Sequence, residues 1–193
     1  MPSRCFAMDV TILLSKAHAE FRKLRSGELG DNLRAQGIEY KTIWGLESYR
    51  LKGIASYLIE TYQPTTEEQK ALAEALWKED VRESKMLATR LYPITEATEP
   101  MAQAWATEVK YTEIADQLCM NMLSRLPFAS ALATQWIDGS EMKQYMALQL
   151  ALRLELKALY PQAQGIAEDS TKPLWLRAVA ARCKNELEVS ELI

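Results

Sequence analysis

Tryptophan recurs along this chain at a nearly regular interval, each time in a similar setting. Trp44, Trp77, Trp105 and Trp136 are separated by 33, 28 and 31 residues, and each precedes a polar turn and a segment with helical periodicity. A repeat of about 30 residues containing two helices is typical of an α-solenoid. The alternative is a plain helical bundle with tryptophans placed by chance. Four matching contexts favour the solenoid, although Trp175, expected inside a helix, departs from the pattern.

Composition supports an all-α fold built from antiparallel helix pairs. Ala, Leu, Glu, Lys, Met and Gln dominate the 193 residues, and these are good helix formers. No alternating run predicts a strand, and seven Gly and seven Pro leave little room for long linkers. We therefore expect a single repeat domain over residues 1–193.

The residues that commonly bind metals are few. Three cysteines lie far apart, and His18 is the only histidine. The sequence therefore predicts no Cys/His zinc cluster, no other metal site and no cofactor. An odd cysteine count without a signal sequence favours a reducing cytoplasm. No run approaches the roughly 20 apolar residues of a membrane span.

Charge argues against a strongly basic nucleic-acid binder. The net charge is −3, and residues 61–120 carry 6 basic and 11 acidic side chains. Residues 1–60 carry 9 basic and 7 acidic ones. Any DNA-binding surface must therefore be a local patch on an acidic body.

The segment from Trp105 to Leu126 holds the best candidate for chemistry. A helix is expected from about Thr112, with Ile114, Leu118 and Met122 forming its apolar stripe. Asp116 follows Ile114 by two residues, so it points roughly 200° away from that stripe. It is a candidate catalytic carboxylate, and the alternative is a surface carboxylate beside Glu113.

A second candidate feature is a polar helix face after Asp80. Arg82, Lys85 and Thr89 fall within about 60° of arc on the expected helix. Two cations on one face can hold phosphates, and the alternative is an ordinary solvated face.

Several segments resemble the HEAT-like DNA alkylation repair glycosylases of the AlkD type. The stretch GLESYRLKGIASYL is similar to an early helix of that family. ALWKEDVRESKMLATRL is similar to its "LW-x-x-x-x-x-E-x-x-x-[LA]-A" repeat, and Trp105–Asp116 follows its "W-x-x-x-[IV]-x-x-x-x-x-x-D" pattern. The resemblance runs from about Gly37 to Leu159. It implies a HEAT-like α–α superhelix whose concave groove grips duplex DNA and whose enzymes excise 3- and 7-alkylated purines.

The resemblance also implies roles for individual residues. Asp116 matches the family's aspartate, which stabilises the oxocarbenium-like sugar in the transition state. Thr112 stands where the family has an aromatic residue, with Tyr111 adjacent, and Tyr145 falls near the position of the family's groove arginine. These three are candidate substrate-binding residues, although both tyrosines could simply pack between helices. The active site therefore matches the family only in part.

The working hypothesis is a DNA-binding protein of this type that excises alkylated purines such as 3-methyladenine or 7-methylguanine. The expected DNA-binding cations are Arg82, Lys85, Lys110 and Lys143. The alternative is a non-catalytic HEAT-like scaffold that binds a protein or peptide in the same groove. Acidic charge and the missing groove arginine favour the scaffold, whereas Asp116 with Arg82 and Lys85 favours DNA.

Overall fold

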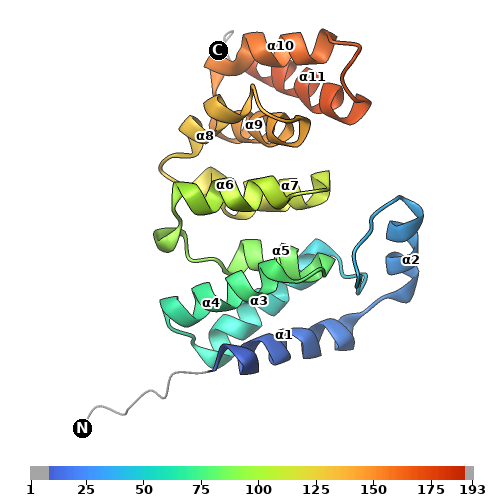
Figure 1. The fold of residues 1–193 in the computed structure, drawn as a ribbon, viewed down its shortest axis with the longest axis vertical. Coiled ribbons are helices and arrows are strands. Elements are labelled where there is room, and N and C mark those ends of the chain that lie inside the picture. Colours follow the sequence, from blue (N-terminus) through green and yellow to red (C-terminus); the bar gives the residue numbers. More distant parts are fainter. Residues whose placement is uncertain (1–8, 190–193) are drawn as a thin grey trace. The chain divides into compact units, whose positions relative to one another are not determined.

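The computed structural model describes residues 9–189, and these residues are almost entirely helical (Figure 1). They form eleven α-helices and three short 3-10 helices. Within this range the β-structure is a single isolated bridge between Thr42 and Val81. The all-α prediction is confirmed.

The chain divides into two compact units, Met1–Glu96 and Ala97–Ile193. Each unit has its own buried core. The single repeat domain and the concave groove expected from the sequence stay predictions.

Residues 9–96, the described part of the first unit, form five α-helices. Helix α1 packs against α3 and α4, and α5 packs against α3 and α4. Thr65 and Glu68 form a complete capping box at the start of α4, as their spacing predicts. The bounds are α1 Val10–Leu24, α2 Gly27–Ala35, α3 Ser48–Tyr62, α4 Thr66–Lys78 and α5 Arg82–Leu91.

A buried carboxylate on α5 fixes the connection between α2 and α3. Glu83 accepts hydrogen bonds from the backbone N–H groups of Trp44, Gly45 and Leu46 at 2.9, 3.0 and 3.2 Å. Arg82 donates to Glu83 at 2.6 Å and to the carbonyl of Leu46 at 3.0 Å. Arg82 is only 3% exposed, so the expectation that it binds DNA phosphates is wrong. Its guanidinium stabilises this connection instead.

Six α-helices lie in the second unit between residues 97 and 189, where the structure is described. Helix α9 packs against α7, α8 and α11, and α10 packs against α11. Eight consecutive residues of α9, from Gln144 to Ala151, are buried, which agrees with its apolar sequence. The bounds are α6 Glu99–Glu108, α7 Thr112–Asn121, α8 Ala129–Trp136, α9 Glu141–Leu154, α10 Tyr160–Glu168 and α11 Leu174–Val189.

Three of the repeated tryptophans occupy comparable positions. Trp77, Trp105 and Trp136 lie in the last turn of α4, α6 and α8, and all three are buried. Trp44 differs, because it lies in the connection before α3 rather than in a helix. These three tryptophans therefore occupy equivalent places in their own helices, as expected, and Trp44 does not.

Across residues 9–189, the structure contains no helix that is both long enough and apolar enough to cross a lipid bilayer.

Candidate active site around Asp116

Asp116 lies at the centre of a polar cluster between α7 and α9. Ile114 and Leu118 bury the opposite side of α7, which leaves Asp116 half-buried beside α9. Its Oδ1 atom accepts hydrogen bonds from the Tyr145 hydroxyl at 3.0 Å and from Gln149 Nε2 at 2.7 Å. The structure thus brings together Asp116 and Tyr145, two of the residues singled out from the sequence.

Gln149 completes a closed three-residue network. Its Nε2 also donates to the Tyr145 hydroxyl oxygen at 3.1 Å. Tyr145 and Gln149 are four residues apart on α9, so they share one face of that helix. The Gln149 amide has two hydrogens to donate and the Tyr145 hydroxyl has one. Because Gln149 donates to the Tyr145 oxygen, the single hydroxyl hydrogen of Tyr145 is donated to Asp116.

An aromatic pair borders the cluster on the α11 side. The ring centroids of Tyr145 and Trp175 are 5.7 Å apart at an interplanar angle of 61°, an edge-to-face arrangement. Trp175 is 38% exposed and the preceding Leu174 is 76% exposed. Apolar surface thus remains open to solvent beside Tyr145, which donates to the carboxylate.

Burial raises the pKa of Asp116 above its ordinary value. The hydrogen bond from Tyr145 and the positive charges of Arg153 and Arg182 oppose this shift, and the negative charge of Glu113 adds to it. Burial also raises the pKa of Tyr145 to about 12. Tyr145 therefore remains a protonated donor at neutral pH.

Two arginines that the sequence analysis missed lie near Asp116. Arg153 is an exposed residue of α9, four residues beyond Gln149, and Arg182 is exposed on α11, seven residues beyond Trp175. Arg182 pairs with Glu186 at 2.7 Å. Within residues 9–189 neither arginine forms an ion pair with Asp116. Both cations thus influence the carboxylate without neutralising it directly.

The remaining candidates in the second unit lie around this cluster or away from it. Thr112 begins α7 one turn before Asp116, and Tyr111 occupies the N-cap position of that helix. Lys110 is exposed between α6 and α7. Lys143 Nζ lies 3.5 Å from Gln103 Oε1 on α6, outside the Asp116 network.

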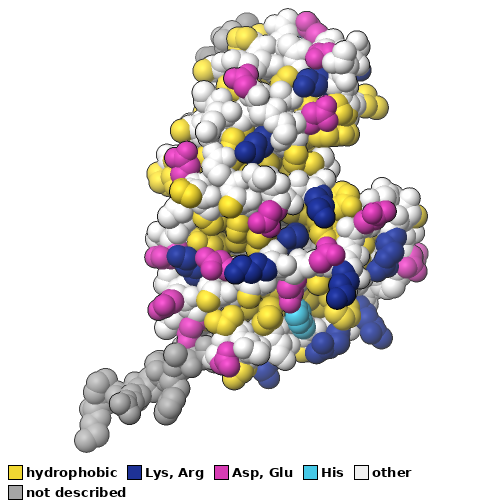
Figure 2. All heavy atoms as spheres, viewed as in Figure 1, with side chains coloured by type: hydrophobic (Ala, Val, Ile, Leu, Met, Phe, Trp, Pro, Cys, Tyr) yellow, Lys and Arg dark blue, Asp and Glu magenta, His cyan; other side chains and the backbone are white. Residues whose placement is uncertain are grey.

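Lys85 belongs to the first unit and interacts with Trp77. Its Nζ donates to the Trp77 carbonyl at 2.6 Å and lies 4.7 Å from the centroid of the Trp77 ring. Much of its donor capacity is thus used inside the unit. On the face of the molecule drawn in Figure 2, Lys and Arg side chains are interspersed with Asp and Glu side chains, without forming a continuous basic surface.

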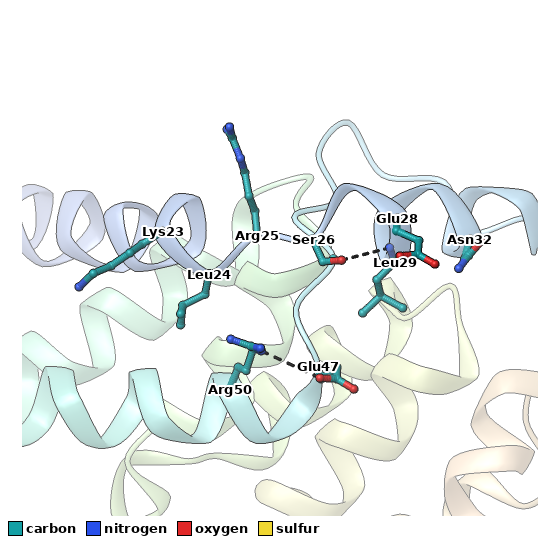
Figure 3. A pocket seen from close by; sticks show the side chains of 10 residues that line it. Lys23, Leu24, Arg25, Ser26, Glu28, Leu29, Asn32, Glu47 and Arg50 are labelled. Carbon is teal, nitrogen blue, oxygen red and sulfur yellow. Dashed lines mark hydrogen bonds and ion pairs between the residues drawn. The ribbon is translucent and has the colours of Figure 1, made fainter.

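A cavity of about 520 Å³ lies in the first unit, and Asp116 is not among the residues that line it. It is lined by residues of α1, α2 and α3 and of the two segments that connect them (Figure 3). Its charges are mixed: Arg50 lies 4.0 Å from Glu47, and the Ser26 hydroxyl caps α2 by accepting from the Leu29 N–H. Arg25 points away from Arg50 in this view. The cavity therefore offers no concentrated charge that would select a substrate.

Within residues 9–189, no three or more His, Cys, Asp or Glu side chains form a group that could hold a metal ion.

The chain was compared with protein families, curated proteins and solved structures. The sequence model of one family, described as DNA alkylation repair enzyme, matches residues 17–170. The chain belongs to this family. The match confirms the family expected from the sequence and supports a function in DNA repair. No curated protein and no solved structure matches the chain.

Proposed function

We propose that this DNA alkylation repair family member binds alkylated duplex DNA and hydrolyses the N-glycosidic bond of 3-methyladenine or 7-methylguanine. The observation that supports this most directly is the setting of Asp116. Its carboxylate is held by Tyr145 and Gln149 and makes no ion pair within residues 9–189. The ring of Tyr145 packs against the partly exposed Trp175. A negative charge of this kind can stabilise a cation that forms next to it.

The reaction requires little more than such stabilisation. The bond between C1′ of the sugar and the ring nitrogen breaks, and its electron pair leaves with the purine. Because an alkylated purine is already positively charged, it departs as a neutral base. The sugar becomes an oxocarbenium ion, to which water adds at C1′ with release of a proton. Asp116 would act while positive charge accumulates on the sugar.

Trp175 and Tyr145 would form the apolar border of this site. Their rings limit water on one side of Asp116, and a lower local dielectric strengthens the attraction between the carboxylate and the sugar cation. Thr112, one turn before Asp116, and Tyr111 at the N-cap are proposed as further substrate contacts. The apolar border itself depends on Trp175, a residue that was not linked to Asp116 from the sequence.

DNA phosphates would bind to exposed cations of the second unit. Arg153 and Arg182 are the new candidates, since both are exposed and their charges act on Asp116. Lys110 and Lys143 remain proposed contacts, as does Lys85 in the first unit. The buried Arg82 is no longer part of this set.

The decisive experiment compares base release by the wild type and by Asp116→Asn. Short duplexes containing one 7-methylguanine or 3-methyladenine would be incubated with each protein, and free base would be quantified by mass spectrometry. We expect release above the spontaneous rate and a fall of at least about tenfold in the variant. Asp138→Asn is a matched control, because Asp138 is an exposed aspartate of the same unit.

Two results would contradict the proposal. One is a wild-type rate equal to the rate without protein, and the other is equal release by the wild type and Asp116→Asn. Absence of DNA binding at low salt would favour the alternative, in which the chain is a scaffold for a protein or peptide.

A further inference from the structure

The two oxygens of the Asp116 carboxylate have different surroundings. Both hydrogen bonds, from Tyr145 and Gln149, end on Oδ1. Oδ2 receives none from residues 9–189, and it is not among the buried atoms that lack a partner in this range. Oδ2 therefore reaches solvent, whereas Oδ1 is engaged inside the protein.

We propose that Tyr145 and Gln149 are positioning residues that hold Oδ1 of Asp116 so that Oδ2 is presented to the sugar. This inference rests on the proposed base excision. According to this inference, Oδ2 alone stabilises the sugar cation, and two side chains of α9 orient the carboxylate.

The number of hydrogen atoms on Gln149 Nε2 and on the Tyr145 hydroxyl determines which group donates to which. Gln149 donates through Nε2 to both Asp116 and the Tyr145 oxygen, so the single hydroxyl hydrogen of Tyr145 goes to Asp116. With two donors directed at Oδ1, a proton added to the carboxyl group goes to Oδ2. Protonation therefore removes the charge from the oxygen that faces the substrate.

Neutral donors suit this task better than cations would. A lysine or arginine in contact with Oδ1 would offset the negative charge that stabilises the sugar. The tyrosine hydroxyl and glutamine amide fix the orientation and leave the net charge of the carboxylate unchanged. The packing of Tyr145 against Trp175 and its burial at 8% exposure restrict the hydroxyl to one position.

The first experiment measures base release against pH for Tyr145→Phe and Gln149→Met. Each substitution removes donors while keeping a side chain of similar size. We expect release on the order of tenfold slower at neutral pH, from the loss of a hydrogen bond to a charged group. The hydrogen bond from Tyr145 lowers the pKa of Asp116, and a donor from Gln149 to the charged carboxylate should act in the same direction. The acid limb of the profile should therefore also move to higher pH in both variants.

Gln164→Met is the matched control for Gln149→Met. Gln164 donates to Glu168 on α10 in the same unit, at 3.1 Å, so the same chemistry is lost outside the site. Its rate and acid limb should equal those of the wild type. Slower release by Tyr145→Phe and Gln149→Met with an unmoved acid limb would indicate a merely structural role and overturn the inference.

The second experiment needs no activity. The Asp116 carboxyl carbon would be followed by NMR during a pH titration of the wild type and both variants, with carbon-13-labelled protein. We expect its pKa to rise in both variants and to remain unchanged in Gln164→Met. An unchanged pKa would overturn the inference. Absence of wild-type base release together with the expected shift would overturn the proposed function and the presentation of Oδ2 to a sugar, but not the positioning of Oδ1 by Tyr145 and Gln149.

Discussion

Arg82 and Glu83, neighbours in the sequence, form an ion pair of 2.6 Å in the interior of the first unit. Their side chains are 4% and 0% exposed. Each charge has further partners in the connection before α3, because Glu83 accepts from three backbone N–H groups and Arg82 donates to a carbonyl. Desolvation of the two ions is therefore offset by a nearly complete set of hydrogen bonds.

Replacement of Glu83 should destabilise the protein strongly. Glu83→Gln removes the charge opposite Arg82, leaving a buried guanidinium without its counterion, and should lower the free energy of unfolding by about 3–5 kcal/mol. Urea denaturation followed by circular dichroism would measure this loss. Glu60→Gln, at an exposed position on α3, is the control and should have little effect. A loss below about 1 kcal/mol for Glu83→Gln would contradict the buried-pair interpretation.

Gly45 should not tolerate a side chain. Its φ is +71°, and a Cβ atom would lie 2.1 Å from the carbonyl oxygen of Ser26. The strained conformation alone costs on the order of 1–3 kcal/mol, and the backbone contact adds to it. Gly45→Ala should therefore lower the midpoint of urea unfolding, whereas Gly53→Ala, with open space and a helical backbone, should not. Equal midpoints for the two variants would contradict this prediction.

Asp116→Asn should be more stable than the wild type at neutral pH. Because the folded-state pKa of Asp116 is raised, the folded protein holds this proton more tightly than the unfolded chain does. The wild type thus loses stability as pH rises from the unfolded-state pKa through the folded-state pKa, and the full cost persists above it. Asparagine does not ionise, so the variant does not lose stability in this way. Parallel urea titrations at several pH values would show a gap that widens as pH rises, and a gap that narrows would contradict the sign.

DNA binding should weaken with salt through Arg153 and Arg182. If each holds one phosphate, Arg153→Gln and Arg182→Gln should each reduce the log–log salt slope by about 0.9. Fluorescence anisotropy with a labelled duplex at several salt concentrations would measure it. Arg125→Gln is the control, since Arg125 is an exposed residue between α7 and α8 that donates to the Asn121 carbonyl. Slopes equal to that of the wild type would exclude both arginines as phosphate contacts.

Local sequence patterns predicted most of the helices correctly. The capping box of Thr65 and Glu68 and the buried stripe of Ile114 and Leu118 follow from spacing alone. The segment after α9 was different. The run from Glu141 to Tyr160 is mostly apolar and is followed by Pro161, a pattern that predicts one long helix ending before the proline. In the structure the chain turns at Glu155, with φ of +53°, and Pro161 lies in the first turn of α10. A proline is compatible with either place, so the sequence could not distinguish them.

The candidate site was only partly predictable. Helical periodicity directs Asp116 away from Ile114, and the spacing of four residues from Tyr145 could have indicated Gln149. Trp175 was not predictable in this way, because its contact with Tyr145 depends on how α11 packs against α9. Arg82 was misassigned for the same kind of reason. Periodicity gives the direction of a side chain on its own helix but not whether another segment covers it.

The hydrogen bonds from residues 44–46 to Glu83 also bear on the order in which the first unit can assemble. This connection has no helix of its own, and its backbone donors find their acceptor 37 to 39 residues further along the chain. A nascent or truncated chain that ends before α5 lacks the Glu83 carboxylate that accepts from them, so the connection should remain open to proteases until α5 has docked. In limited proteolysis, cleavage within residues 44–46 would therefore indicate that α5, a helix distant in sequence, has not docked.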